Sequence, residues 1–248
     1  MDKIIINADD FGLRRRCTDA ICEAFRKGLI TDSTWLANGE AFEYAAERIG
    51  TEHLEGRIGI HLNLTEGKPL TEAIKAFPGF TANGAFHGKI NRTKPLTREE
   101  QRAVYEELSA QARRIEETGL AITHADSHHH IHTGIFIAPI AARVCKEHGI
   151  RKIRLHRNIG AISPQKRMVK KLYNAWLHAQ GFTTTRFFGS MEDVERDGLK
   201  DGLEIMVHPD FDGQGRLIDR TGEDGGEARG LPLFLPHGDF RPFSYREL

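Results

Sequence analysis

The chain has 248 residues, of which 39% are hydrophobic and 28% charged, and this composition excludes an intrinsically disordered protein. Its 35 basic residues match its 35 acidic residues, so there is no surplus of positive charge to neutralise a phosphate backbone. We therefore expect a globular protein that is not a general nucleic-acid binder.

The cysteines and the apolar runs indicate the compartment. Cys17, Cys22 and Cys145 form neither a disulfide framework nor a zinc-knuckle spacing, so we expect reduced thiols. The apolar run at 4–6 is too short for a signal peptide, and no stretch reaches the ~18 apolar residues that a membrane span needs. These observations predict a cytoplasmic protein without a membrane partner.

The first part of the chain alternates short strands with helices. Short β-branched and apolar runs predict strands, and amphipathic periodicity that ends at a glycine predicts helices. In chain order these are a strand at 3–8, a helix at 18–27, a strand at 33–36, a helix at 41–49 and a strand at 57–62. The segment 63–96 has several glycines and prolines and little periodicity, which predicts a loop insertion over the functional site.

The second part continues the same alternation. Thr97 and Glu100 form a capping box that begins a long helix to about residue 118. Ser163 before Pro164 begins another helix, to about residue 180. The other predicted elements are strands at 121–125, 150–155, 183–188 and 202–207 and helices at 135–148 and 190–197. From about residue 212 glycine and acidic residues predict an irregular C-terminal tail.

These elements amount to about seven βα units, and no linker of the kind that separates domains interrupts them. Repeated βα units form parallel sheets, and this number of units favours a barrel over an open sheet. We therefore predict one α/β domain over residues 1–248, a parallel (β/α) barrel that is either closed or incompletely closed.

Side chains capable of binding a metal follow several of the predicted strands. Asp9 and Asp10 follow the first strand, His61 lies at the end of the third, and His208 follows the last. Each has an ordinary structural explanation when taken alone, such as an aspartate that caps a helix or a histidine in the core. Because the carboxyl ends of barrel strands converge on one face, their shared position predicts a single site.

The segment 126–132, Asp-Ser-His-His-His-Ile-His, is the strongest local pattern. His128 and His132 share a face if this segment is helical, and His128, His130 and His132 share one if it is extended. Imidazole is the commonest protein ligand of transition metals, and its second nitrogen needs an acceptor, a role open to Asp126. We treat Asp126, His130 and His132 as candidates for orienting ligands or contacting substrate.

One aspartate and two histidines would leave coordination positions of a cation open for water and substrate, as in catalytic sites. A further carboxylate and a distant histidine would supply the base and the acid for hydrolysis of an amide or ester. Mixed oxygen and nitrogen ligands favour zinc, manganese, iron or cobalt over magnesium. The pattern therefore predicts a hydrolase with one divalent cation.

These motifs resemble those of the YdjC-like (ChbG-type) carbohydrate deacetylases, within the polysaccharide-deacetylase-like barrels. The matching segments are Asn-Ala-Asp-Asp-Phe-Gly at 7–12, Asn-Gly at 38–39, Gly-Ile-His-Leu-Asn-Leu-Thr at 59–65, the histidine segment at 126–132 and Val-His-Pro at 207–209. They occur in the order typical of the family. The resemblance implies removal of N-acetyl groups from small amino sugars such as chitooligosaccharides, with magnesium or zinc as the metal.

The resemblance also implies a role for individual residues. Asp10, His61 and His128 match the metal ligands of the family. Asp9 matches the proposed catalytic base, and His208 matches the proposed general acid.

The chain departs from the family near its C-terminus. Relatives usually carry a further helix before a terminal Ser-Tyr, whereas 223–237 contains glycines and prolines that no stable helix interior tolerates. Ser244 and Tyr245 match the family's ending. The sequence therefore predicts that the barrel is closed differently in this region.

Three other functions share parts of the pattern. An iron oxygenase uses the same ligand set but would need oxygen. A phosphoesterase would need basic groups beside the metal, and Arg14, Arg15 and Arg16 offer them. A non-catalytic sugar-binding barrel would keep its ligand after loss of Asp9. We favour a metal-dependent deacetylase with a small acetylated sugar as its partner, and a homodimer is one candidate assembly.

Overall fold

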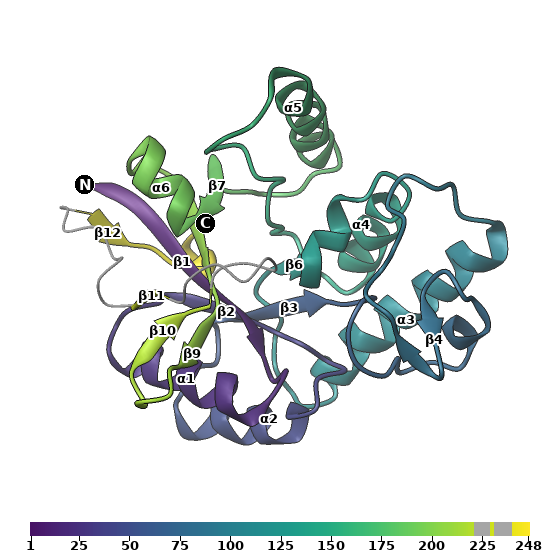
Figure 1. Cartoon of the computed structure of the whole chain (residues 1–248), viewed down its shortest axis with the longest axis horizontal. Helices are drawn as coiled ribbons and strands as arrows, with labels where there is room; N and C mark the ends of the chain where they lie inside the picture. Colours follow the sequence, from purple (N-terminus) through teal and green to yellow (C-terminus); the bar gives the residue numbers. More distant parts are fainter. Residues whose placement is uncertain (221–228, 231–239) are drawn as a thin grey trace.

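The computed structural model describes residues 1–220, 229–230 and 240–248. Its centre is a curled sheet of six parallel strands that forms an open half-barrel, in the spatial order β6-β3-β2-β1-β8-β7 (Figure 1). The strands are β1 (Asp2–Phe11), β2 (Asp32–Trp35), β3 (Ile58–Leu62), β6 (Ala125–Ser127), β7 (Phe187–Ser190) and β8 (Leu203–Val207). The prediction of an incompletely closed (β/α) barrel is confirmed.

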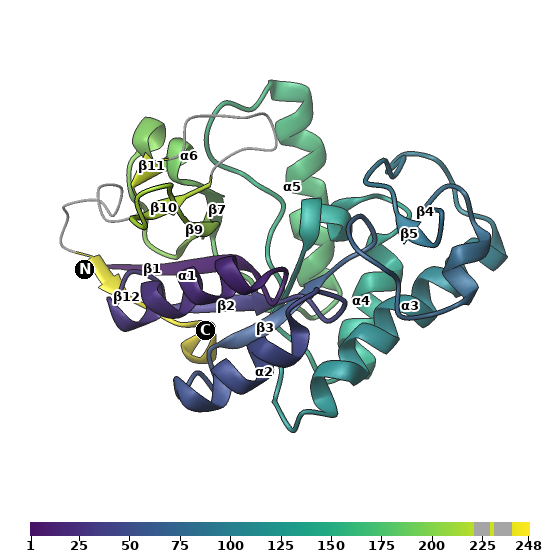
Figure 2. The same ribbon diagram turned by 60° about the horizontal axis from the view of Figure 1, so that its bottom comes forward.

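The helices lie around the outside of this sheet (Figures 1 and 2). They are α1 (Arg15–Arg26), α2 (Phe42–Thr51), α3 (Arg98–Glu116), α4 (Ala138–Glu147), α5 (Pro164–Ala179) and α6 (Met191–Asp197). The predicted N-caps Thr97 and Ser163 are present, since each accepts a hydrogen bond from the backbone of the first turn, and Ser190 caps α6 in the same way. All the helices expected from the sequence are therefore found, with shifts of a few residues at their ends.

The gap between β6 and β7 is spanned without a regular strand, so the prediction of a strand at 150–155 is wrong. Ile153 bridges to Ala125 on one side, and Lys152 bridges to Thr183 on the other. Further along, the side chain of Asn158 donates to the Arg186 carbonyl and accepts from the Phe188 amide. The regular backbone pairing of 150–155 is thus limited to a single bridge on each side, which is too short for a strand. The neighbouring strands β6 and β7 also begin four residues later than predicted.

The two regions predicted as irregular contain some regular structure. Residues 63–96 include a short 3-10 helix, η1 (Ala73–Ala76), and a hairpin of β4 (Thr81–Ala82) and β5 (Ala85–Phe86), with η1 packed against α3. After β8, the strands β9 (Pro209–Phe211), β10 (Leu217–Asp219) and β11 (Arg229–Gly230) form an antiparallel sheet. The tail prediction is wrong at β10 because Leu217 and Asp219 alternate inward as a strand requires. The glycine- and proline-rich stretch at 223–237 falls almost wholly outside the described residues.

The chain returns to the beginning of the barrel at its C-terminus. The strand β12 (Phe240–Pro242) pairs in parallel with the first residues of β1, and the 3-10 helix η3 (Tyr245–Glu247) follows (Figure 2). Within the described part of the chain, none of the helices is long and apolar enough to cross a membrane.

Candidate metal centre

The predicted site residues converge on the carboxyl ends of the barrel strands. Asp10 lies near the end of β1, His61 lies in β3, His128 directly follows β6, and His208 directly follows β8. The pairing of β8 with β1 aligns Val207 with Ala8, so that His208 follows on beside Asp9. The sequence-based expectation that these segments meet at one rim is therefore met by the fold.

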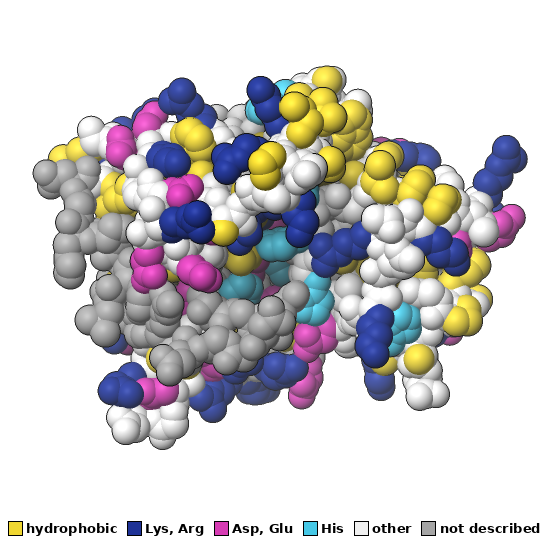
Figure 3. Space-filling model, turned by 45° about the horizontal axis from the view of Figure 1, so that its top comes forward, with side chains coloured by type: hydrophobic (Ala, Val, Ile, Leu, Met, Phe, Trp, Pro, Cys, Tyr) yellow, Lys and Arg dark blue, Asp and Glu magenta, His cyan; other side chains and the backbone are white. Residues whose placement is uncertain are grey.

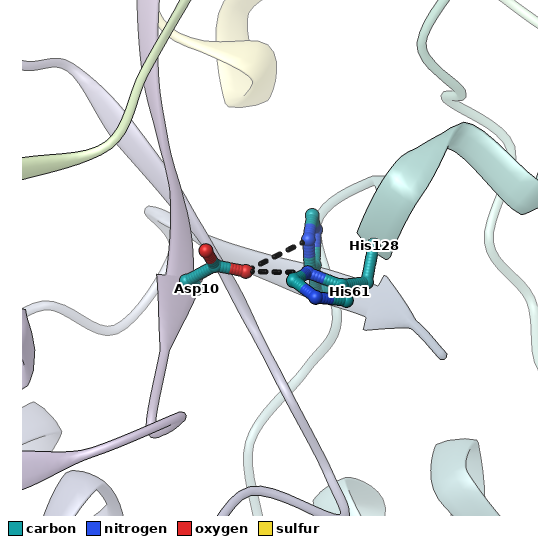
Figure 4. A group of neighbouring side chains, drawn as sticks. All are labelled: Asp10, His61 and His128. Atoms are coloured by element: carbon teal, nitrogen blue, oxygen red, sulfur yellow. Dashed lines mark hydrogen bonds and ion pairs between the residues drawn. The ribbon is translucent and has the colours of Figure 1, made fainter. Parts of the chain in front are cut away.

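Asp10, His61 and His128 form a compact cluster (Figure 4). The Oδ1 atom of Asp10 lies 3.2 Å from Nε2 of His61 and 2.8 Å from Nδ1 of His128. The three candidate ligand atoms lie within 4.8 Å of one another, which is compact enough for a single cation to contact all of them. The Asp10 backbone has a φ of 71°, and this left-handed conformation accompanies a register shift in β1 between Ala8 and Phe11.

Each histidine of the cluster has a carboxylate on its other ring nitrogen. Asp126 Oδ1 lies 2.6 Å from Nδ1 of His61, and Glu66 Oε2 lies 3.1 Å from Nε2 of His128. Such outer carboxylates fix the orientation and the tautomer of a metal-binding imidazole. Asp126 thus occupies the acceptor position considered from the sequence. Glu66 was missed, although the Asn63 side chain, which accepts from the Glu66 amide, builds the tight turn that carries it.

The charges of the cluster suit a divalent cation. Burial would raise the pKa of Asp10, but hydrogen bonds from His128 and His61 outweigh burial and hold it well below its usual range. Asp10 therefore remains an anion, and two further carboxylates, Asp126 and Glu66, surround the two imidazoles. An oxygen anion and two imidazoles, ordered by surrounding carboxylates, form a donor set that fits zinc or a similar ion.

A second group of potential ligands, Asp9, His61 and Asp126, lies beside the first. The guanidinium of Arg154 already forms ion pairs with both carboxylates of this second group. Nη1 and Nη2 of Arg154 donate to Oδ2 and Oδ1 of Asp9 at 2.6 and 2.7 Å, and Nη1 lies 2.6 Å from Oδ2 of Asp126. Because Arg154 supplies the positive charge here, we expect one cation per chain rather than two. No sequence pattern pointed to Arg154.

Asp9 and Asp10 have different environments, as expected for neighbouring residues at the end of a strand. Burial would raise the pKa of Asp9, but the paired guanidinium of Arg154 outweighs burial and holds it far below the usual range. The side chain of Asn7 also donates to Asp9 Oδ1 at 2.9 Å. Asp9 is therefore an ionised carboxylate in a fixed orientation, while Asp10 faces the two histidines.

The cluster opens into a cavity of about 330 Å³. Asp9, Asp10, His128, His130 and His208 are among its lining residues. Figure 3 shows histidine side chains in a hollow of the surface, with basic side chains nearby. The predicted base and acid thus share one cavity with the candidate metal ligands.

The histidine segment adopts neither of the two conformations considered from the sequence. His129 and His130 have φ values of 50° and 53°, so the backbone reverses within the short 3-10 helix η2 (His128–Thr133). His128 consequently reaches Asp10, whereas His132 is buried and its Nε2 lies 3.3 Å from the carbonyl of Arg154. The segment therefore brings His128 and His130, but not His132, to the lining of one cavity. His132 supports the backbone of Arg154, and His130 lines the cavity.

The basic residues after Asp10 are engaged with other groups. Arg14 pairs with Glu66 at 2.7 Å, and Arg16 pairs with Asp210 at 2.7 Å. Arg15 lies over the ring of Tyr44. These contacts weaken the sequence argument for a phosphoesterase, because the three arginines on which it depended already have partners.

The pKa values of the two histidines predict that added metal stabilises the fold more strongly as the pH rises. Burial would lower both values, but Asp126 and Asp10 outweigh it at His61, as Asp10 and Glu66 do at His128. The pKa values rise from 6.5 to about 10 and about 9, respectively. Both imidazoles therefore carry a proton in the metal-free protein at neutral pH and must release it to bind a cation.

The direction of this pH dependence follows from the linkage between proton binding and folding. These raised pKa values stabilise the metal-free fold fully below pH 6.5, and this contribution is lost as the pH rises towards about 10. Proton competition for the ligands weakens over the same range. The Tm increase caused by a buffered concentration of free zinc should thus grow between pH 6 and pH 9. An increase that is largest at pH 6 would contradict the assignment of these histidines as ligands.

The fold and the site together define a parallel α/β barrel with an aspartate and two histidines at its carboxyl rim. The chain belongs to the YdjC-like protein family, whose model matches residues 3–229.

Solved structures similar to the chain include the following two. A protein of Enterococcus faecalis V583, provisionally named a cellobiose-phosphate cleavage protein, has 24% sequence identity and a TM-score of 0.66, covering 86% of this chain and 83% of that one. The lactam utilization protein of Thermus thermophilus has 13% identity and a TM-score of 0.48, covering 83% of this chain and 90% of that one. The likeness to the first of these supports the fold.

Proposed function

We propose that the protein is a metal-dependent hydrolase that removes the acetyl group from an N-acetylated amino sugar or a short chitooligosaccharide. One observation carries this proposal: Asp10, His61 and His128 meet in a cavity that Asp9 and His208 also line. A ligand set alone would suit several metal chemistries. A further ionised carboxylate and a further imidazole are the groups that hydrolysis of an amide requires.

Asp10, His61 and His128 would hold the divalent cation, which when bound would polarise the acyl carbonyl and lower the pKa of water. Asp9 would accept the proton of the attacking water, since Arg154 keeps this carboxylate ionised and oriented. His208 would donate a proton to the departing nitrogen. Its Nδ1 is buried and has no hydrogen-bond partner among the described residues, so within them it is not committed elsewhere.

The sugar as substrate is supported by family membership and by the resemblance of the motifs to carbohydrate deacetylases. The cavity volume of about 330 Å³ lies at the lower end of the range for small-molecule sites, which suits one sugar ring and its acetyl group. We propose a small sugar, rather than nucleic acid or a membrane, as the partner.

A panel of N-acetylated mono- to tetrasaccharides tests the proposed function. The protein is stripped with a chelator, reconstituted with zinc, and assayed for released acetate without oxygen, with the chelated protein as the control. We expect acetate from at least one sugar only after reconstitution. No acetate from any sugar would overturn the proposal, and sugar binding without release would favour a non-catalytic sugar-binding barrel.

A further inference from the structure

The end of the chain enters the barrel from the side opposite the metal centre. Phe243 donates its amide hydrogen to the carbonyl of Ile4, near the beginning of β1. Both Ser244 Oγ and the Tyr245 amide donate to Asp32, the first residue of β2, at 2.8 and 3.1 Å. The Tyr245 side chain is completely buried and stacks on His124, with ring centroids 3.8 Å apart. The C-terminus is therefore an integral part of the barrel interior.

The hydroxyl of Tyr245 contacts a buried acidic residue. It donates to Oε2 of Glu204 at 2.5 Å, and the other oxygen of Glu204, Oε1, accepts from Nε of Arg154 at 2.7 Å. Tyr245, Glu204 and Arg154 are all 0% exposed. Each oxygen of Glu204 is thus held by one of these two donors, away from solvent.

The remaining nitrogens of Arg154 face the candidate site. Nη1 and Nη2 donate hydrogen bonds to the two oxygens of Asp9, and Nη1 also contacts Asp126. A guanidinium is planar and its donors have a fixed geometry, so a change on its Nε side also moves the nitrogens that hold Asp9. The ring of Phe188, 4.8 Å from the guanidinium carbon, packs against it. Glu204 is thereby linked mechanically to the carboxylate that would accept a proton.

We propose that Tyr245 is a positioning residue for the site: its hydroxyl fixes Glu204, Glu204 fixes the guanidinium of Arg154, and Arg154 sets the orientation of Asp9. This inference rests on the proposed function, in which Asp9 is the proton acceptor. Without the hydroxyl, Glu204 Oε2 would be a buried oxygen without its donor, and the carboxylate would turn to find another. Arg154 would follow it, and Asp9 would leave its productive orientation.

The test substitutes Tyr245→Phe and compares it with Tyr44→Phe. Tyr44 donates to Asp19 at 2.6 Å between α1 and α2, so the control also removes one tyrosine–carboxylate hydrogen bond, but neither residue is among those that line the cavity. We expect Tyr245→Phe to lower kcat for the acetylated sugar roughly 10- to 100-fold with little change in KM, as for a misplaced reacting group. Tyr44→Phe should leave kcat and KM unchanged.

A second readout does not depend on turnover. The Nε–H of Arg154 is buried and hydrogen-bonded to Glu204, so it should give a slowly exchanging NMR resonance. We expect Tyr245→Phe to shift this resonance and speed its exchange at least tenfold, and Tyr44→Phe to leave it unchanged. Should Tyr245→Phe fail to fold, Glu204→Gln, which keeps the side-chain volume but removes the charge, should lower kcat in the same way.

The outcomes separate this inference from the proposed function. An active wild-type protein whose folded Tyr245→Phe variant keeps both its kcat and the Arg154 resonance would overturn the positioning role. A wild-type protein without deacetylase activity would overturn the proposed function, while a perturbed resonance would still support the link from Tyr245 to Arg154.

Discussion

Replacing Asp9 by asparagine should remove most of the turnover while the protein still binds one divalent cation. Asparagine has the size of aspartate but cannot accept the proton, and loss of a general base costs roughly 10²- to 10⁴-fold in rate. Asp10, His61 and His128 are untouched, so metal binding should persist. Acetate release under saturating sugar, together with elemental analysis of the purified variant, measures both properties.

Asp10→Asn and a matched control complete this test. Asp10→Asn should lower metal affinity as well as turnover, because Asp10 faces both histidines. Asp193→Asn is the control, since Asp193 is also a buried aspartate beside an arginine, Arg157, but accepts a hydrogen bond from the Ser190 amide at the start of α6. It should keep wild-type kcat. Equal loss of metal from the Asp9 and Asp10 variants would mean that both carboxylates are ligands and that the base lies elsewhere.

Replacing His208 by alanine should slow amide hydrolysis far more than ester hydrolysis. An amide nitrogen leaves only when it receives a proton, whereas the oxygen of an activated aryl acetate leaves without one. His208 is placed beside Asp9 by the pairing of β8 with β1, on the wall of the same cavity. We expect a loss of roughly 10²- to 10⁴-fold on the N-acetyl sugar and a much smaller loss on the aryl acetate.

His130→Ala is the control for the His208 experiment. His130 lines the same cavity and is also an imidazole, but we assign it no proton transfer. Its replacement should change the rates on both substrates by similar factors. If His208→Ala also reduces both rates equally, His208 packs or orients its neighbours and does not act as the acid.

Features of the fold that depend on local sequence could be predicted. The caps Thr97 and Ser163 satisfy backbone donors within the next turn, so their effect is visible in a few consecutive residues. The strand prediction at 150–155 is wrong because strand formation there does not depend on local sequence alone. Whether residues 150–155 form a strand depends on how far their backbone pairs with segments distant in the chain, and this pairing is limited to one bridge on each side.

In the candidate site, too, some features could be predicted from the sequence and others could not. The segments that carry Asp10, His61 and His128 could be brought together in advance because the ends of parallel strands converge. The choice of these three as the ligands came from the resemblance to the family. Arg154 was missed because it is 145 residues from Asp9 in the chain and its own segment carries no recognisable motif. The position of His132 away from Asp10 depends on the left-handed backbone of His129 and His130. Neither helical nor extended periodicity describes this conformation.

Titration of metal into chelated protein tests the central claim most directly. Acetate release from the best sugar of the panel is followed as zinc is added in fractions of an equivalent, and the series is repeated with magnesium. We predict that activity rises from zero and levels off at one zinc ion per chain, and that magnesium is the weaker activator. Full activity in the chelated protein, or a plateau at two ions per chain, would contradict a single catalytic cation at Asp10, His61 and His128.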